Sequence, residues 1–433
     1  MAELIAGTDK SRIAGLSFGG QMHGLVILDR EDRVIRPCIL WNDGRAKRES
    51  DYLNTEVGQD TLAACTGNIS FASFTAAKLL WLKQVEPENF ERIQKIMLPK
   101  DYLCYRMTGT FCTDVSDASG TLLLDVKNRS WSGEMCRICG IEQSCLPRVY
   151  ESYEQVGTLK RELAGALGLP EGVVVAAGAG DNAAAAVGTN TVGDGKCNLS
   201  LGTSGTLFIS SRTFRMDSAY ALHSFGHADG NYHLMGCMLS AAACNEWWAG
   251  EILQVKDYAA LQSEIRGLGE NHVFFLPYLM GERSPWNAPN ARGTFTGITL
   301  DTSRHDLTQA VLEGVAFGMR DMLEIARSLG IVLPRATICG GGAKSPLWRK
   351  IIANTLQLAL DIPACEEGPS MGAAILAMVA GGEYSSVQEA TGQIVKTTAA
   401  EEPDLELTKK YEERYQQFRL LYPSLKNVFE KIQ

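Results

Sequence analysis

Short apolar runs alternate with helix-like segments along much of the chain. Three valines at positions 173–175 lead into a glycine turn and then into an alanine-rich stretch. Residues 336–339 lead into three glycines and then into a helical pattern over residues 346–360. A strand, a glycine turn and a helix in this order are typical of layered α/β structure. The pattern therefore predicts an α/β fold.

A different pattern occupies residues 196–236. Apolar and polar residues alternate there, and turn residues occur at positions 202–205 and at Asp229-Gly230. This predicts a β-meander that opens a second domain. We place the boundary near residue 190, which gives an N-terminal domain of residues 1–190 and a C-terminal domain of residues 191–433. Residues 405–433 have a helical period with charged faces, and we expect them to pack on the second domain.

Length and charge narrow the class of protein. The chain has 433 residues, more than one core usually serves, which favours two or three domains. The formal net charge is −9, and an acidic surface repels a phosphate backbone, so nucleic acid is not an expected partner. An anionic substrate must then be held by local backbone donors or by a metal ion, because the overall field does not attract it.

The remaining composition indicates a cytoplasmic protein. The first residues lack a basic segment followed by a long apolar run, so no signal peptide is expected. The apolar stretch at 373–382 is too short to cross a bilayer. The cysteines, 12 in all, are typical of free thiols in a reducing compartment. We expect small-molecule partners and no membrane partner, and we leave a homodimer open.

Asp181 stands where an apolar strand ends and a helix begins, within the segment GAGDNAAAAVG. A carboxylate at that position is an acceptor that faces a cleft. It can take a proton from a substrate hydroxyl or help to hold Mg²⁺. The alternative is an ordinary N-cap aspartate, and the residues alone leave it open.

Two glycine-rich turns are candidates for binding a phosphorylated ligand. The segment LGTSGT, residues 201–206, forms a tight turn whose backbone N–H groups can make an anion-binding nest. The segment CGGGAKS, residues 339–345, lets a flat ligand approach the backbone ahead of a helix N-terminus. Neither segment is a Walker A loop or a G-x-G-x-x-G fingerprint. The alternatives are an ordinary hairpin turn and an ordinary strand-to-helix turn.

Two further loops carry polar and aromatic side chains together. The segments GGQMHG, residues 19–24, and ILWNDGR, residues 39–45, supply Met, His, Trp, Asn, Asp and Arg near strand ends. A polyol needs several donors and acceptors beside one apolar platform, and this set provides both. Taken singly, His23 is more often structural, and the Asn-Asp-Gly run is more often a turn. Together the four sites predict a cleft between two domains, with sugar on one side and nucleotide on the other.

These motifs, in this order, resemble the FGGY carbohydrate kinases of the actin/Hsp70/sugar-kinase superfamily. Residues 293–313, GTFTGITLDTSRHDLTQAVLE, fit that family's C-terminal signature at every restricted position. Residues 74–84, FTAAKLLWLKQ, fit the N-terminal signature until Val85 departs from it. The stretches QMHGLVILD, RPCILWNDGRA, LPKDYLCYRMTG, SLGTSGT and FLPYLMGERSPW resemble the xylulokinase branch. The resemblance implies a two-domain α/β fold, ribonuclease H-like, with a central cleft.

The resemblance also implies a role for each site. Asp181 would be the general base that deprotonates the attacking sugar hydroxyl, and a ligand of Mg²⁺. The sugar contacts would be Met22, His23, Trp41 and Asn182. The ATP contacts would be Gly202, Thr203, Ser204, Gly341, Gly342 and Ser345. Mg²⁺-ATP would be the donor and D-xylulose 5-phosphate the product, in a phosphoryl transfer that needs in-line positioning and charge neutralisation.

One departure from the family and three rival functions remain. Family members begin with a strand, an Asp-x-Gly-Thr turn that contributes to Mg²⁺ and phosphate binding, and a hairpin. Only 21 residues precede Met22 here, and they contain no Asp-x-Gly-Thr sequence, so we expect the first domain to be incomplete at its start.

The rival functions are a sibling kinase for ribulose, gluconate or glycerol, which fold does not exclude, and a non-catalytic binding remnant. A metal-dependent hydrolase using His223, His227 and His233 is the third.

Overall fold

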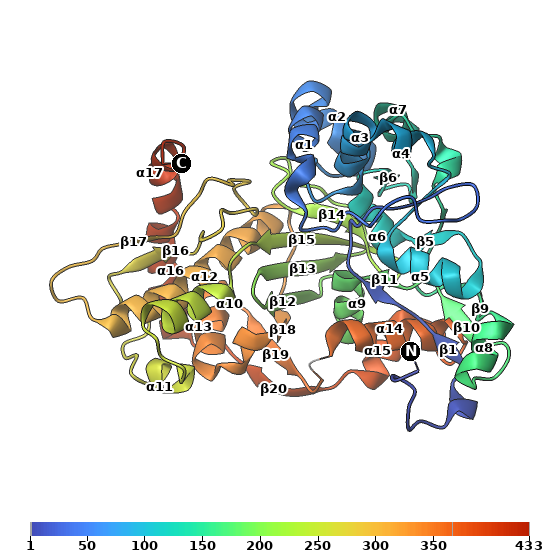
Figure 1. The fold of residues 1–433 in the computed structure, drawn as a ribbon. Coiled ribbons are helices and arrows are strands. Elements are labelled where there is room, and N and C mark those ends of the chain that lie inside the picture. Colours follow the sequence, from blue (N-terminus) through green and yellow to red (C-terminus); the bar gives the residue numbers. More distant parts are fainter. Residues whose placement is uncertain (1, 366, 433) are drawn as a thin grey trace.

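The computed structural model describes residues 2–365 and 367–432 and arranges them in two halves (Figure 1). The strands of the first half are β1 (Gly15–Leu16), β2 (Gly19–Gly20), β3 (Val26–Leu28), β4 (Lys95–Met97), β5 (Cys112–Asp114), β6 (Leu124–Asp125), β7 (Ser130–Trp131), β8 (Arg148–Tyr150), β9 (Gln155–Thr158), β10 (Val174–Ala176) and β11 (Ala179–Gly180). Its helices are α1 (Lys47–Tyr52), α2 (Gln59–Thr66), α3 (Thr75–Val85), α4 (Pro87–Glu91), α5 (Pro99–Thr108), α6 (Val115–Ala118), α7 (Gly133–Cys139), α8 (Arg161–Leu167) and α9 (Asp181–Gly188).

The strands after residue 190 are β12 (Cys197–Leu201), β13 (Gly205–Ser211), β14 (His223–Gly226), β15 (Tyr232–Met238), β16 (Phe274–Leu276), β17 (Thr294–Thr296), β18 (Arg335–Cys339), β19 (Ala359–Pro363) and β20 (Thr397–Glu401). The helices there are α10 (Ala242–Glu246), α11 (Tyr258–Ser263), α12 (Arg304–Ser328), α13 (Pro346–Leu356), α14 (Gly368–Ala380), α15 (Val387–Ile394), α16 (Leu405–Phe418) and α17 (Leu421–Phe429).

Parallel strand pairs organise the first half. β1 lies beside β10, the strand predicted from the valines at 173–175. β2 lies parallel to β11, with Gly19 opposite Ala179 and Gly20 opposite Gly180. Because the carboxyl ends of parallel strands meet at the same edge, the chain leaves β2 and β11 at neighbouring points. The loop after Gly20 and the helix after Gly180 therefore begin side by side.

One seven-stranded sheet organises the second half, in the order β14-β15-β13-β12-β18-β19-β20. The pairs β12–β13, β13–β15 and β14–β15 are antiparallel, which confirms the meander predicted over residues 196–236. β12 and β18 are parallel, with Ser200 opposite Cys339. The two glycine-rich turns that follow these strands therefore lie at the same edge of the sheet.

Two predictions on helices have different outcomes. The C-terminal segment forms α16 and α17, and its Tyr411, Tyr415 and Phe418 belong to the core of the second half, as predicted. The helix predicted over residues 346–360 is wrong at its end, because α13 stops at Leu356. Gln357 has a left-handed backbone with φ 56°, and the following apolar residues form β19 instead.

Helices α14 and α15 come late in the chain but pack on the first half, beneath α9 in Figure 1. Ile375 and Leu376 of α14 share a core with Ala184 and Val187 of α9. The residue-190 boundary stays a prediction, and in space these two helices lie with the first half.

Gly372→Ala should destabilise the protein, because α9 and α14 touch through backbone. A methyl group on Gly372 would lie 1.8 Å from the carbonyl oxygen of Ala184, far inside van der Waals contact. Overpacking of this kind costs about 1–3 kcal/mol. We expect a lower denaturation midpoint in urea, followed by intrinsic fluorescence. Gly392→Ala, where a methyl group meets nothing within 4 Å, is the control within α15 and should not lower the midpoint, because alanine favours a helix more than glycine does.

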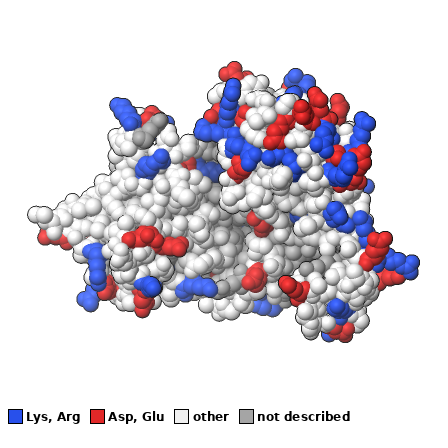
Figure 2. Space-filling model, viewed as in Figure 1, with Lys and Arg blue, Asp and Glu red and all other residues white. Residues whose placement is uncertain are grey.

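Charged side chains are unevenly spread over the face shown in Figure 2. They gather over α1–α4 and α7, while the hollow between the halves is bordered mainly by uncharged residues. Among residues 2–365 and 367–432, no helix combines the length and apolar character needed to cross a membrane.

Candidate active site

The loop after β2 and the start of α9 meet through glycine backbone. A methyl group on Gly180 would lie 2.9 Å from Cγ of Met22, so only glycine lets the buried Met22 side chain lie against this strand. Asp181 follows at once as the first residue of α9. The structure therefore brings Met22 and Asp181 together, as the sequence predicts.

Asp181 presents a carboxylate that its neighbour holds in place. Its Oδ1 accepts hydrogen bonds from the backbone N–H of Asn182 at 2.8 Å and from the Asn182 amide at 3.0 Å. Burial raises the pKa of Asp181 above its usual range, although the bonds from Asn182 oppose that shift. Gly180 occupies the N-cap position, and the structure gives it no side-chain capping bond. The carboxylate is thus not the N-cap of α9 and can act as an acceptor.

His23 is fixed in a neutral form at the end of the same loop. Its Nδ1 lies 2.7 Å from the carbonyl oxygen of Gly120, and its ring stacks on Phe74 at 4.6 Å between centroids. Burial lowers the pKa of His23 to about 3, so the ring is uncharged near neutral pH. A carbonyl oxygen only accepts, so Nδ1 carries the proton and Nε2 is left as an acceptor.

The side chains of Lys78 and Thr75 fix the backbone of His23 by hydrogen bonds. Both side chains donate to its carbonyl oxygen, Lys78 Nζ at 2.8 Å and Thr75 Oγ1 at 3.1 Å. His23 has φ 69°, a left-handed backbone conformation that residues other than glycine adopt only at a cost in free energy. Trp41 stands on a neighbouring loop, since Ile39 pairs with Leu25, and it is 53% exposed.

A buried cluster of charged side chains is connected to the backbone just before Asp181. The sequence did not predict this cluster. Lys100 Nζ lies 2.6 Å from Asp101 and 2.8 Å from Asp114, and all three side chains are fully buried. Asp114 accepts from the Ser116 hydroxyl at 2.5 Å, and that hydroxyl accepts from the N–H of Gly180 at 3.1 Å. The cluster therefore reaches the backbone atom next to Asp181. The only signal in the sequence is the density of charged residues inside apolar segments at 98–118.

The two halves touch near His23 through residues that the sequence also did not predict. Asn68 donates to the carbonyl oxygen of Ser224 at 2.8 Å and accepts from its N–H at 3.1 Å, as a neighbouring strand would. The guanidinium of Arg283, from the second half, lies 4.1 Å from the ring centre of Phe71 in the first. These contacts close one side of the space between the halves.

On the second half, the turn after β12 is tied to α10. The carbonyl oxygens of Gly202 and Thr203 accept from the N–H groups of Ala242 and Ala241, at 2.8 and 2.9 Å. Ser204 completes the turn before β13 begins at Gly205. Fixing the turn by its carbonyl groups leaves its N–H groups and hydroxyls for a ligand, as an anion nest requires.

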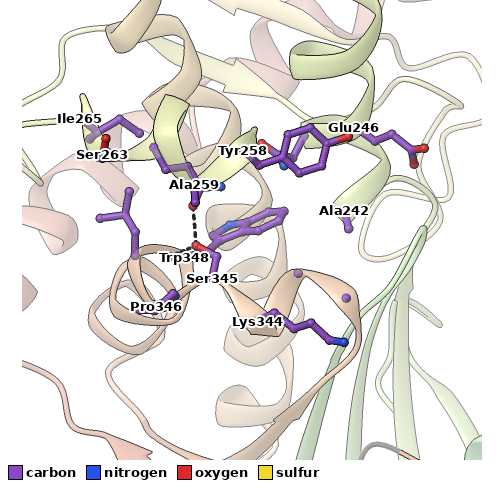
Figure 3. A pocket seen from close by; sticks show the side chains of 15 residues that line it. Ala242, Glu246, Tyr258, Ala259, Ser263, Ile265, Lys344, Ser345, Pro346 and Trp348 are labelled. Carbon is purple, nitrogen blue, oxygen red and sulfur yellow. Dashed lines mark hydrogen bonds between the residues drawn. The ribbon is translucent and has the colours of Figure 1, made fainter. Parts of the chain in front are cut away.

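A pocket of about 860 Å³ opens beside this turn (Figure 3). Gly341, Gly342 and Ser345 line it, together with residues of α10, α11 and α13. Gly202, Thr203 and Ser204 do not line this pocket. Their turn nevertheless lies against the other glycine-rich turn, since a methyl group on Gly340 would lie 3.0 Å from the backbone nitrogen of Gly202. The structure thus brings the two turns together, as the sequence predicts. The sugar-side set and the nucleotide-side set lie on different halves.

The histidine-based metal site is not supported. Among residues 2–365 and 367–432, no three His, Cys, Asp or Glu side chains are grouped so as to hold a metal ion. His223 stacks on Phe225 and His233 on Phe208, and burial lowers the pKa of both. A Mg²⁺ ion needs fewer protein ligands, because it commonly binds one or two carboxylates plus phosphates and water. Asp181 supplies one such carboxylate, while the turn after β12 lies on the other half.

Known proteins show the same architecture. Residues 1–188 match the N-terminal domain, and residues 197–381 the C-terminal domain, of the FGGY family of carbohydrate kinases. The xylulose kinase of Escherichia coli (strain K12) is 42% identical over 417 residues, which cover 95% of this chain and 85% of that protein.

Two solved structures extend the comparison. A xyloylose kinase from Brucella ovis has a TM-score of 0.91 at 40% identity, covering 97% of this chain and 86% of that one. The gluconate kinase from Lactobacillus acidophilus has a TM-score of 0.94 at 26% identity, covering 100% and 88%. These matches confirm the predicted two-domain sugar-kinase fold.

Proposed function

The chain belongs to the FGGY family of carbohydrate kinases, and from this premise we propose that it transfers the γ-phosphoryl group of ATP to D-xylulose, giving D-xylulose 5-phosphate and ADP. The substrate is suggested by the xylulose kinases, which are 32% to 42% identical to this chain. The observation that carries the reaction is the half-buried carboxylate of Asp181, held by Asn182 beside the loop of Met22 and His23.

On the sugar side, each residue has a distinct task. Asp181 accepts the proton of the attacking hydroxyl, and its raised pKa makes it a stronger base than an exposed aspartate. His23 accepts a sugar hydroxyl through Nε2, while Met22 and Trp41 supply apolar surface. Asn182 orients the base and contacts the sugar.

On the nucleotide side, backbone groups replace basic side chains. Gly202, Thr203 and Ser204 bind the phosphates, and Gly341 and Gly342 lie against the adenosine, with Ser345 beside it. Asp181 would hold Mg²⁺ together with the phosphates, and the ion would supply charge neutralisation. Phosphoryl transfer depends mainly on positioning and on charge neutralisation, so these are the kinds of group that the reaction needs.

The substrate is the part of the proposal most open to a rival. The gluconate kinase of Lactobacillus acidophilus shares the fold over the whole chain, and fold does not fix the sugar. Ribulose and glycerol are two more candidate acceptors, and binding without catalysis is a rival role for the same cleft.

Coupled ADP release with Mg²⁺-ATP tests the proposal. The purified chain is assayed with D-xylulose, D-ribulose, gluconate and glycerol in turn. D-Xylulose should give the highest kcat/KM of the four. If another compound gives a higher kcat/KM, that compound is the substrate. If none of the four causes ADP release, the result supports binding without catalysis.

The rate should depend on pH through Asp181. A base must be ionised to accept a proton, and burial keeps this carboxyl protonated to higher pH than an exposed aspartate. We expect kcat/KM for the sugar to rise with pH through an apparent pKa above the ordinary value of an aspartate, then to level off. The measurement is a pH profile at constant ionic strength. A profile that stays flat at acid pH, while the protein remains folded, would contradict the assignment.

A further inference from the structure

Two carboxamides face the nucleotide pocket with hydrogen-bonding capacity to spare. Gln262 on α11 is 8% exposed and Asn245 on α10 is 7% exposed, and both line the pocket. Within the described part of the chain, Asn245 has no hydrogen-bond partner for its amide, and Gln262 has only Ser345. Buried polar groups are normally paired, so open amides in a pocket indicate a polar ligand.

Ser345 decides which way the amide of Gln262 points. The Ser345 hydroxyl accepts from the N–H of Trp348 at 3.1 Å and lies 2.5 Å from Oε1 of Gln262 (Figure 3). The hydroxyl donates its one proton to Oε1, and turning the amide would break this bond. The bond therefore favours the orientation with Oε1 towards Ser345 and Nε2 away from it. The carbonyl oxygen still has a second lone pair for a ligand.

The surroundings of Gln262 suit a flat ring. Tyr258 and Ala259 of α11 and Pro346 of α13 line the pocket, and Trp348 lies beside Ser345 in Figure 3. Trp348 already donates its indole N–H to the carbonyl oxygen of Leu312, so it offers the pocket only apolar surface. A planar base fits such a pocket better than a sugar with hydroxyls on both faces.

We propose that Gln262 is the residue that selects adenine over guanine in this pocket. The inference rests on the proposed function, in which the pocket holds the nucleotide. Nε2 of Gln262 donates to N7 of adenine, and Oε1 accepts from the N6 amino group, which is the pairing glutamine makes with this base. Guanine carries O6 in place of the amino group, so its oxygen would face Oε1. Ser345 prevents the amide from turning to relieve that repulsion.

Calorimetric binding of ADP, GDP and 7-deaza-ADP to the intact chain, without sugar, tests the proposal. A bidentate base contact discriminates by about 5- to 150-fold, so ADP should bind the parent tighter than GDP by a factor in that range. 7-Deaza-ADP lacks the N7 acceptor and should bind the parent several-fold more weakly than ADP. In Gln262→Leu, ADP, GDP and 7-deaza-ADP should bind with nearly equal affinity.

Two further variants keep the test decisive. Ser345→Ala releases the amide and should lower the ratio of ADP to GDP affinity. That ratio is the readout because the variant also removes the N-cap of α13. Gln416→Leu, on exposed α16, is the matched control and should keep the parent's ratio. A parent without preference for ADP, or a Gln262→Leu variant that retains it, overturns the proposal. ADP-selective binding without sugar-dependent ADP release would instead sink the proposed function.

Discussion

Asp181→Asn is expected to lower kcat for sugar phosphorylation by about 10²- to 10⁴-fold, the range that a positioned general base contributes. The amide has the shape of the carboxylate but cannot accept the proton of the attacking hydroxyl. KM for Mg²⁺-ATP should rise as well, because the variant also lacks the carboxylate proposed to hold Mg²⁺. Asp181→Ala should be as inactive, since it also lacks the base.

Steady-state kinetics of sugar-dependent ADP release measures this effect, and thermal denaturation checks the fold. Asp194→Asn is the control, because Asp194 is an exposed aspartate on the segment after α9 and should keep the parent's kcat. If Asp181→Asn retained most of the parent's kcat, Asp181 would not be the base.

Lys100→Met is expected to give the largest loss of stability, about 3–5 kcal/mol in the free energy of unfolding. The lysine is the cation that lies within salt-bridge distance of Asp101 and Asp114, both fully buried. Methionine has a similar volume, so the loss comes from leaving two carboxylates buried without it. Since Ser116 links this cluster to Gly180, we also expect kcat to fall in whatever protein remains folded.

Asp117→Asn is the matched control for Lys100→Met. Asp117 is in the same cluster, 3.7 Å from Lys100, but both of its carboxylate oxygens lack a hydrogen-bond partner. Burial raises the pKa of Asp117 well above its usual range, which favours the neutral acid, and an amide is a close substitute for that form. We expect its urea midpoint to stay near the parent's, with a change below about 0.5 kcal/mol. A loss as large as that of Lys100→Met would place the charge on Asp117 instead.

The order of strands, turns and helices could be predicted where one local signal dominates. Asp181 follows a strand and glycines, and it begins a helix as expected. The closeness of the two glycine-rich turns also followed, because each comes after a parallel strand of one sheet. The end of α13 could not be predicted, because the apolar residues 358–360 fit a helix as well as a strand. Only the left-handed backbone of Gln357 ends the helix there.

Contacts between distant segments could not be predicted. Lys100 lies far along the chain from Gly180, and its charge gave no sign that it was buried. Gln262 stands in a helix of 6 residues, and nothing in its sequence shows that this side chain faces a pocket. Its orientation depends on Ser345, which comes 83 residues later. Such residues become visible only when the fold brings their partners together.

The return of α14 and α15 to the first half has a consequence for synthesis of the chain. About 180 residues separate α9 from α14, and at roughly 5–20 residues per second a ribosome needs about 10–40 s to make them. During that time the apolar face of α9, including Ala184 and Val187, has no partner helix to cover it. A nascent first half is therefore a natural client for a chaperone, and a gene cut near residue 190 would leave that face exposed for good.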